Sequence, residues 1–375
     1  RRDALPGADY IIISVDVARN ETWDSDWRIP VSHGIRQVTG ELGGPGGLFH
    51  SLRQIPLHVE MARDIADLCP DALVMVESNP LNRICLAMTR FGGLKNVMGL
   101  CHGVEITQWA LGRVLGHETD ELLATAAGTN HFTWILDLRL QATGDDLYPA
   151  LRDKLKAYKP DFWALSRKMF DVYGFFPSCG DDHIGEYLAF AWELVGMEGP
   201  QTADREEGAQ GFRRYLRQQA ASDGPLTPFT DKLGGGHDEE KTDFFFTPRS
   251  WVDTLAFPIM DSLQTNKLRR MPAVNMINNG AVRNLPADVF VEGPAMVDSS
   301  GCRLVSMGDL PKPLAAFCRR DVDQMEAAVH AAMSGSRNAV LQAVLLDPVV
   351  DSISAAEKTV DEMLKANAPY LPGFK

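Results

Sequence analysis

The chain has 375 residues, of which 45% are hydrophobic and 23% charged, which is typical of a globular protein with two domains or one elaborated domain. Its formal net charge of -13 argues against a nucleic-acid partner, because phosphate binding needs clustered lysine and arginine. No apolar run is long enough to cross a bilayer and no signal-peptide pattern opens the chain, so we expect no membrane partner. Six scattered cysteines without a C-x-x-C pair are typical of reduced thiols in a cytoplasmic protein: Cys69, Cys85, Cys101, Cys179, Cys302 and Cys318.

The beginning of the chain leads directly into an apolar segment. Residues 1–9 are typical of the tail of a helix whose earlier part is absent, so we expect an N-terminally truncated chain. Residues 10–17 form an apolar run that predicts a buried parallel strand. A loop rich in Trp, Asp and Pro is expected next. Five glycines between Gly40 and Gly47 then open a helix over 48–69.

Strands and helices alternate up to about residue 115. We expect strands at 72–76 and 97–100, and helices at 81–90 and 104–115. This alternation predicts a parallel α/β sheet, in which ligands bind beyond the carboxyl ends of the strands. Asp16, Asn79 and Cys101 all lie at such ends, which favours a binding site there.

The pattern changes after about residue 118. An antiparallel strand is predicted at 132–140, helices at 145–176 and 184–197, a polar helix and mobile loop at 200–245, mixed helix and short strands at 248–297, and amphipathic helices at 322–345 and 352–367.

Cys101 and His131 are the strongest candidates for a metal site. A thiolate and an imidazole suit a borderline transition metal, and two protein ligands leave positions open for substrate. Each residue alone is more often structural, a buried apolar thiol or a satisfied histidine. Together, with Cys101 at a strand end, they favour the metal site.

Three other phrases have two interpretations each. The backbone amides of residues 43–47 either approach a phosphate or form a tight loop before a helix. Asn79 either faces a nicotinamide ribose, as in dehydrogenase sheets, or caps a helix. Asp181 and Asp182 either cap a helix or supply a general base.

Six phrases in order resemble glycoside hydrolase family 4, the glycosidases that need NAD and a divalent metal. They are Gly-Pro-Gly-Gly with Leu52-Arg53-Gln-Ile-Pro56, Ser-Asn79-Pro80, Gly-Leu-Cys101-His102-Gly, Asn130-His131-Phe-Thr-Trp134, Asp182-His183-Ile-Gly-Glu-Tyr187 and Asn284-Leu-Pro286. The resemblance implies a Rossmann-like NAD-binding sheet, incomplete at its N-terminus, and then an α+β domain of the lactate/malate dehydrogenase-like type. We place these domains at 1–118 and 119–375.

The resemblance also implies a redox route to hydrolysis instead of the two-carboxylate route. NAD⁺ oxidises C3 of the sugar, a base removes the C2 proton, the aglycone is eliminated from C1, water adds, and the hydride returns. The family branch with Cys-His at this point acts on unphosphorylated sugars, so we expect an unphosphorylated hexoside, either neutral or uronic.

Roles for individual residues follow from the same resemblance. They are Cys101 and His131 as ligands of Mn²⁺ or another divalent metal; Asp182 as base, with Asp181 as fallback; His102 as proton donor or hydroxyl ligand; Asn79, Asn130 and Arg283 as sugar contacts; and Val15, Asp16 and Asn79 as NAD contacts.

Two other functions compete with a glycosidase. One is an NAD-dependent 2-hydroxyacid dehydrogenase, which would need no metal. The other is a non-catalytic sugar or nucleotide sensor. The resemblance further implies a homodimer or homotetramer, for which the apolar C-terminal helices offer an interface.

Overall fold

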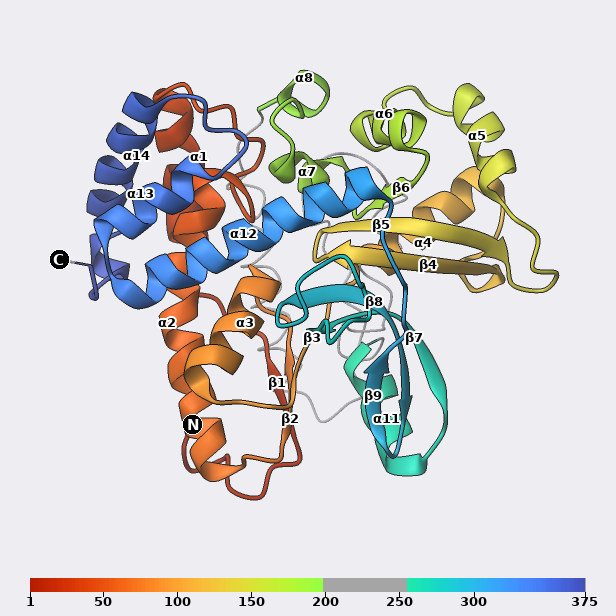
Figure 1. Ribbon diagram of the computed structural model, residues 1–375, viewed down its shortest axis with the longest axis horizontal. Helices are drawn as coiled ribbons and strands as arrows, with labels where there is room; N and C mark the ends of the chain where they lie inside the picture. The colour runs from red at the N-terminus through yellow and green to blue at the C-terminus, as the bar shows by residue number, and fades with distance from the viewer. Residues whose placement is uncertain (198–254, 375) are drawn as a thin grey trace, which may run out of the picture.

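The computed structural model describes residues 1–197 and 255–374 (Figure 1). Nine strands form one sheet in the order β1–β2–β3–β7–β8–β4–β5–β6, with β9 paired to β8. The strands are β1 (Tyr10–Ile13), β2 (Leu73–Val76), β3 (Val97–Gly99), β4 (Leu122–Thr129), β5 (Phe132–Leu140), β6 (Phe176–Ser178), β7 (Arg269–Ile277), β8 (Phe290–Asp298) and β9 (Gly301–Leu304). The α-helices are α1 (Arg19–Ser32), α2 (Gly44–Leu68), α3 (Leu81–Gly92), α4 (Gly103–Leu115), α5 (Tyr148–Ala157), α6 (Ala164–Tyr173), α7 (Asp181–Ile184), α8 (Trp192–Val195), α11 (Phe257–Thr265), α12 (Lys312–Ser334), α13 (Arg337–Leu345) and α14 (Ile353–Ala366).

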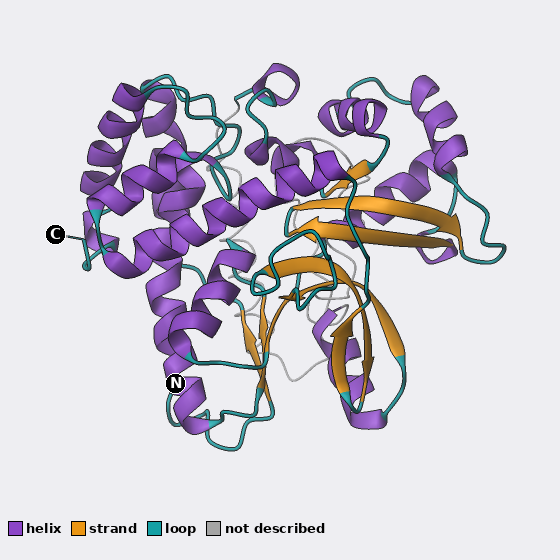
Figure 2. Ribbon diagram, in the orientation of Figure 1, coloured by secondary structure: helices purple, strands orange, loops and turns teal. Residues whose placement is uncertain are grey.

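The parallel part of the sheet confirms the predicted Rossmann-like α/β class. β1 pairs with β2 and β2 with β3, both in parallel, and the connections run through α1, α2 and α3. The remaining pairings are antiparallel, from β3 with β7 to β5 with β6. An α+β part follows the parallel strands, as predicted, and its strands continue the same sheet (Figure 2). The division at residues 118 and 119 stays a prediction.

The prediction of a loop after the first strand is wrong, because helix α1 occupies this part of the chain. Its buried residues include Trp23, Asp26 and Ile29, which recur at helical spacing. The indole N–H of Trp23 donates to the Thr39 carbonyl at 2.9 Å, and Trp27 donates to the Val38 carbonyl at 2.8 Å. Packing against α2 and α14 thus stabilises a segment whose Trp, Asp and Pro content is typical of a loop.

Several other boundaries differ from the predicted ones. Residues 1–9 form turns instead of a helix end, and the first strand stops at Ile13. The strand β4 was not predicted, since its Ala-rich sequence has low strand propensity and depends on pairing with β5 and β8. The helical stretch predicted at 145–176 is two helices followed by β6, and 184–197 holds only short turns of helix.

The C-terminal helices pack against α1, α2 and α3, the helices that connect the parallel strands. α12 begins ten residues before the predicted 322 and packs against α2, α3, α13 and β4 (Figure 1). A cluster of buried apolar side chains joins α2, α3 and α12–α14 to β1 and β2. The polar stretch predicted at 200–245 lies outside the described residues. None of the helices in the described ranges is both long and apolar enough to cross a membrane.

A buried ion pair links α1, α2 and the C-terminal region. Arg53 donates to Asp26 at 2.5 and 3.1 Å and to the Asn367 side chain at 2.6 Å, and both charged groups are almost fully buried. Asp26→Ala leaves the guanidinium buried without its carboxylate, which typically costs about 3–5 kcal/mol. We expect a fall in unfolding free energy of this size by denaturant titration. The matched control is Asp24→Ala on the exposed face of α1, which we expect to unfold like the wild type. Equal stability of both variants would contradict a structural role for the ion pair.

Candidate active site

Cys101 and His131 come together although they are far apart in the sequence. Cys101 follows the end of β3, and His131 lies in the turn between β4 and β5. The Cys101 Sγ is 3.0 Å from the His131 Nε2. His131 has φ 60°, a left-handed conformation that is uncommon outside glycine. Such backbone strain is often found where a side chain must be aimed at a functional site.

Both side chains of this pair are strongly desolvated. Burial raises the pKa of the Cys101 thiol to about 12, with a further contribution from Glu292. Burial and the neighbouring His183 lower the pKa of His131 to about 3. The neutral imidazole is the form that binds metals, and a bound cation would favour the thiolate. Within the described residues, the buried His131 Nδ1 has no hydrogen-bond partner.

A buried carboxylate supports the pair from the adjacent strands. Glu292 accepts hydrogen bonds from Asn130 at 3.1 Å and Asn275 at 2.9 Å, and a short one from the Thr133 hydroxyl. Burial raises the pKa of Glu292, although these three donors oppose the shift. Asn130 is thus held beside Cys101, and the sequence analysis missed both Asn275 and Glu292. The one sequence feature that could have indicated Asn275 and Glu292 is that each is a polar residue within an otherwise apolar strand.

The segment 179–187 brings further polar groups to the same place. The His183 ring stacks on the His131 ring, with centroids 4.6 Å apart and planes 7° from parallel. Ligand atoms of His131, Cys179 and His183 all lie within 4.8 Å of one another. Neither Cys179 nor His183 was predicted from the sequence to belong to the site.

Asp181 and Asp182 lie in different environments. The Asp181 carboxylate accepts from the backbone N–H groups of Leu165 and Ser166, both at 2.8 Å, and from the Ser166 hydroxyl at 2.6 Å. It therefore caps the first turn of α6, a helix other than the one that its own position in the sequence suggested. Asp182 is exposed next to His183.

His102 and Glu105 lie at the start of α4. Burial lowers the pKa of His102 to about 4 and raises that of Glu105 to about 7. The His102 Nε2 is 4.0 Å from the nearest Glu105 oxygen. This histidine is therefore neutral near pH 7 and follows directly after the metal-ligand candidate Cys101.

The proposed cofactor contacts lie beyond β1 and β2. The Ser78 hydroxyl accepts from the Val15 N–H at 2.9 Å and donates to the Val15 carbonyl at 2.7 Å, which joins the two strand ends. Burial would raise the pKa of Asp16, but His50 and Arg19 lower it below the usual value. No hydrogen bond engages the half-buried Asn79 side chain among the described residues. Arg283 lies apart from these groups, on an exposed loop where it pairs with Asp309 at 3.1 Å.

The glycine-rich segment forms a tight loop held by a protein carboxylate. Glu186 Oε2 accepts from the backbone N–H groups of Glu41, Leu42 and Gly43 at 2.8, 2.6 and 2.7 Å, and the Thr39 hydroxyl donates a short bond to the other oxygen. A Cβ on Gly43 would lie 2.2 Å from the Glu186 carbonyl oxygen. Within the predicted segment 43–47, the N–H groups of Gly43, Gly44 and Gly46 donate to the side chains of Glu186, Asp347 and Gln37. These amides are therefore not available for a phosphate.

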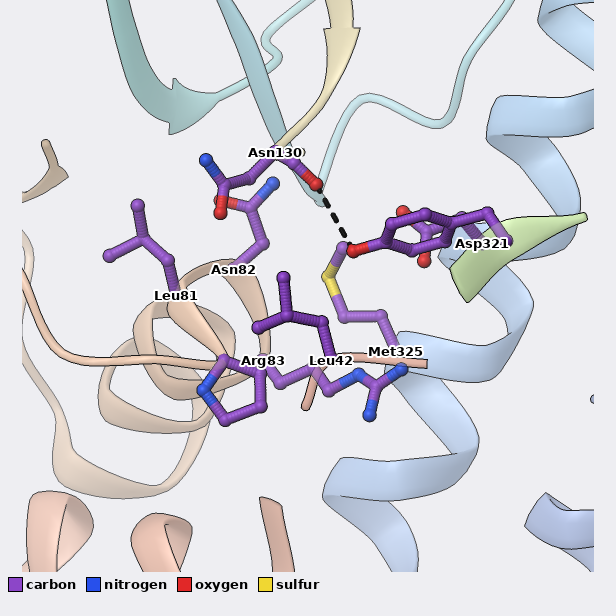
Figure 3. A pocket seen from close by; sticks show the side chains of 9 residues that line it. Leu42, Leu81, Asn82, Arg83, Asn130, Asp321 and Met325 are labelled. Carbon is purple, nitrogen blue, oxygen red and sulfur yellow. Dashed lines mark hydrogen bonds between the residues drawn. The ribbon is translucent and has the colours of Figure 1, made fainter. Parts of the chain in front are cut away.

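A small pocket opens between this loop and α12. Its wall includes Leu42, Arg83, Asn130, Tyr187 and Asp321, and the Tyr187 hydroxyl donates to the Asn130 carbonyl at 3.4 Å (Figure 3). Asn130 therefore faces both this pocket and the Cys101–His131 pair. Asn130 is therefore the residue that connects the pocket with the Cys101–His131 pair.

These features are those of an α/β fold with a candidate active site beyond the carboxyl ends of its parallel strands. The sequence profile of the "Family 4 glycosyl hydrolase" matches residues 1–117, and that of the "Family 4 glycosyl hydrolase C-terminal domain" matches residues 126–350. The chain belongs to family 4 of the glycosyl hydrolases, as the resemblance implied.

Known relatives carry several glycosidase names. An α-glucosidase of Erwinia rhapontici is 32% identical over all of this chain and 85% of its own length, and an α-galactosidase of Rhizobium meliloti is 30% identical over all of this chain and 76% of its own. A solved 6-phospho-α-glucosidase from gut microorganisms, in complex with NAD and Mn²⁺, shares the fold with a TM-score of 0.80 at 19% identity, over all of this chain and 84% of its own.

The carboxylate of Glu186 stabilises the loop that carries residues 41–43. Glu186→Ala leaves three buried N–H groups and one hydroxyl without an acceptor, and each such group costs about 1–3 kcal/mol. We expect the unfolding free energy to fall by at least about 3 kcal/mol, and the exchange protection of the amides of residues 41–43 to be lost. Hydrogen-exchange mass spectrometry and denaturant titration measure both. Glu193→Ala on the exposed α8 is the control. Retained protection in Glu186→Ala would contradict the assignment.

Proposed function

We propose that this protein is an NAD- and divalent-metal-dependent glycosidase that acts on an unphosphorylated hexoside. The observation that carries the proposal is the buried pair of Cys101 and His131, 3.0 Å apart at the carboxyl ends of the strands. Membership of family 4 implies NAD and a divalent metal, and a soft thiol beside a neutral imidazole suits a transition metal.

The donor atoms of the pair fit a divalent metal. Two protein ligands leave most coordination positions for sugar oxygens and water, which is the arrangement of an open catalytic site. Asn130 and Glu292 hold the turn that carries His131, and such supporting hydrogen bonds orient metal ligands. When bound, NAD⁺ supplies a hydride acceptor and the metal, Mn²⁺ in our proposal, polarises the sugar oxygens.

The chain offers contacts for the nicotinamide cofactor beyond β1 and β2. Val15, Asp16 and Asn79 occupy the positions where open α/β sheets bind nucleotides. The Asn79 side chain has no partner among the described residues and is available for a ribose or sugar hydroxyl. The Asp16 carboxylate, which stays ionised, suits a ribose hydroxyl.

Asp182 is our assignment for the base that removes the C2 proton of the sugar. It is the more exposed of the two adjacent carboxylates, while Asp181 is occupied in capping α6. We assign His102, which is neutral near pH 7 and follows Cys101 directly, to bind a sugar hydroxyl; the alternative role as proton donor to the leaving group would need its protonated form. Asn130 lines the pocket and is assigned to a sugar hydroxyl. Arg283 has only its surface pair with Asp309 in support, so it is the weakest of these assignments.

The choice of an unphosphorylated sugar rests on Cys101-His102 and on the names of relatives. Besides the α-glucosidase and α-galactosidase, an α-galacturonidase of Thermoanaerobacterium saccharolyticum is 29% identical over all of this chain and 82% of its own length. A probable 6-phospho-β-glucosidase of Bacillus subtilis is 28% identical, so phosphorylated sugars belong in the test. Uronides are included for the same reason. A homodimer or homotetramer remains our expectation and is measured by light scattering.

Cleavage of a glycoside should require NAD⁺, Mn²⁺ and the thiol of Cys101. We expect the protein to hydrolyse one member of a panel of nitrophenyl glycosides, covering neutral, uronic and 6-phosphorylated sugars, only when NAD⁺ and Mn²⁺ are both present. Cys101→Ala should reduce kcat/KM by at least about 10²-fold, since metal polarisation is worth several kcal/mol. Cys302→Ala, at a partly buried cysteine on β9, is the matched control. Net NADH formation from a hydroxy acid without metal would overturn the proposal in favour of a dehydrogenase.

The base assignment makes a separate prediction. Asp182→Ala should lower kcat by about 10²–10⁴-fold, the usual contribution of a positioned base. In D₂O the wild-type product should carry deuterium at C2, and the variant should lose this exchange in the same proportion as its kcat. Asp181→Asn is the comparison, because its defect should be seen in unfolding free energy more than in C2 exchange. If Asp182→Ala exchanges C2 at the wild-type rate, another group is the base.

A further inference from the structure

A histidine that binds a metal usually has its ring fixed by a hydrogen bond from its second nitrogen, and His131 lacks this hydrogen bond. Its Nε2 is 3.0 Å from the Cys101 Sγ, and its buried Nδ1 has no hydrogen-bond partner among the described residues. The hydrogen bond from Asn130 to Glu292 holds the turn and does not reach the ring. Since rotation of an imidazole about its Cβ–Cγ bond is only loosely restricted by its own geometry, another contact must hold the His131 ring.

The ring of His183 lies flat on the ring of His131. The two centroids are 4.6 Å apart and the planes are 7° from parallel, which is within the range of offset stacking between aromatic rings. Rotation of the His131 ring out of its plane would drive its atoms into the His183 ring. The lone pair of an imidazole nitrogen lies in the plane of its ring, so two parallel rings do not direct lone pairs at one ion. The stack therefore suits His183 to support a metal ligand and not to be one.

His183 is itself held by contacts on both sides of it in the chain, and these contacts do not involve His131. It lies in α7, after Asp181 and before Glu186. Asp181 caps the first turn of α6, and Glu186 accepts three backbone N–H groups of the loop 41–43. Polar atoms of Glu41, His183 and Glu186 also lie within 4.8 Å of one another. The His183 ring is thus a fixed surface for the ring of His131.

We propose that His183 is a positioning residue of the metal site. Its ring, by stacking, holds the His131 imidazole in the orientation in which Nε2 faces Cys101, in place of the usual hydrogen bond from Nδ1. The inference rests on the proposed function, because the ion is the divalent metal of that site. It also links two parts of the site. Asp182, our candidate base, directly precedes His183, so one anchored segment orients the metal ligand and places the base.

The binding test needs no sugar and no NAD. Mn²⁺ alone is titrated into the metal-free full chain, and the free ion is measured by electron paramagnetic resonance. Removal of a group that orients a metal ligand costs about 10- to 100-fold in metal affinity. We expect a loss of about tenfold in His183→Ala and in His183→Leu, because a ring stack is weaker than a hydrogen bond to a charged partner. His183→Phe should keep nearly all of the wild-type affinity, since it offers a flat ring without a nitrogen.

The three variants separate the possible roles of His183. Leucine fills a similar volume without a flat face, and phenylalanine has the face without the nitrogens. Wild-type affinity in His183→Leu would overturn the proposal, because the ring face would then be unnecessary. A loss in His183→Phe as large as that in His183→Ala would also overturn it, because the nitrogens of His183 would then be required. The control is His330→Ala, at an exposed histidine on α12, which should bind Mn²⁺ as the wild type does.

Two structural measurements keep the test decisive if thermal unfolding shows that a variant is unstable, or if the wild type binds no Mn²⁺. In crystals of the wild type with Mn²⁺, His131 should bind the ion, the two rings should stay parallel, and no His183 nitrogen should reach the ion. Separated rings, or a bond from His183 to the ion, would overturn the inference.

Absence of Mn²⁺ binding by the wild type would instead overturn the metal site of the proposed function. In that case the metal-free structure of His183→Ala decides the inference. The His131 ring should then occupy more than one orientation, because nothing stacks on it. A ring in the same single orientation as in the wild type would show that His183 does not position it.

Discussion

The candidate site depends on one row of residues that crosses four strands. Gly99 in β3 pairs with Asn275 in β7, Asn275 pairs with Glu292 in β8, and Glu292 pairs with Gly128 in β4. Cys101 lies two residues beyond one end of this row and His131 three beyond the other. The hydrogen bonds of Glu292 to Asn275 and Asn130 connect this row with the turn that carries His131.

The glycines at both ends of this row are needed for close packing. A Cβ on Gly99 would lie 2.9 Å from the Leu81 side chain and 3.0 Å from the Asn275 Cβ. A Cβ on Gly128 would lie 2.7 Å from the Phe132 carbonyl oxygen. Larger residues would push β3 away from β7, or β4 away from β5. Since the metal pair spans these strands, a shift of the backbone on this scale would also move the thiol relative to the imidazole.

The ends of the second and third strands could be predicted from the sequence to within one residue, whereas the end of the first strand and the neighbours across the sheet could not. Apolar runs followed by Asp16, Asn79 and Cys101 marked the parallel strands, because local pattern determines where a buried strand stops. Asn275 and Glu292 act through pairing partners far along the chain, which no local pattern reveals. The same applies to β4, whose alanines form a strand only between β5 and β8. Cys179 and His183 are visible in the sequence, but only the fold shows that they lie beside His131.

The glycine-rich segment shows how the same backbone geometry serves two kinds of anion. Three successive N–H groups at the start of α2 form the type of concave donor site that binds phosphate in many proteins. Here Glu186 fills it, and Glu41 lies close enough that burial and this second carboxylate raise the pKa of Glu186 to about 7. Sequence alone cannot separate the two cases, because the competing carboxylate lies more than 140 residues away. Its position three residues after His183 means that the anion site now anchors the segment carrying Asp182 and His183. The loop of residues 41–43 therefore binds Glu186, and through Glu186 it holds the segment that carries Asp182 and His183.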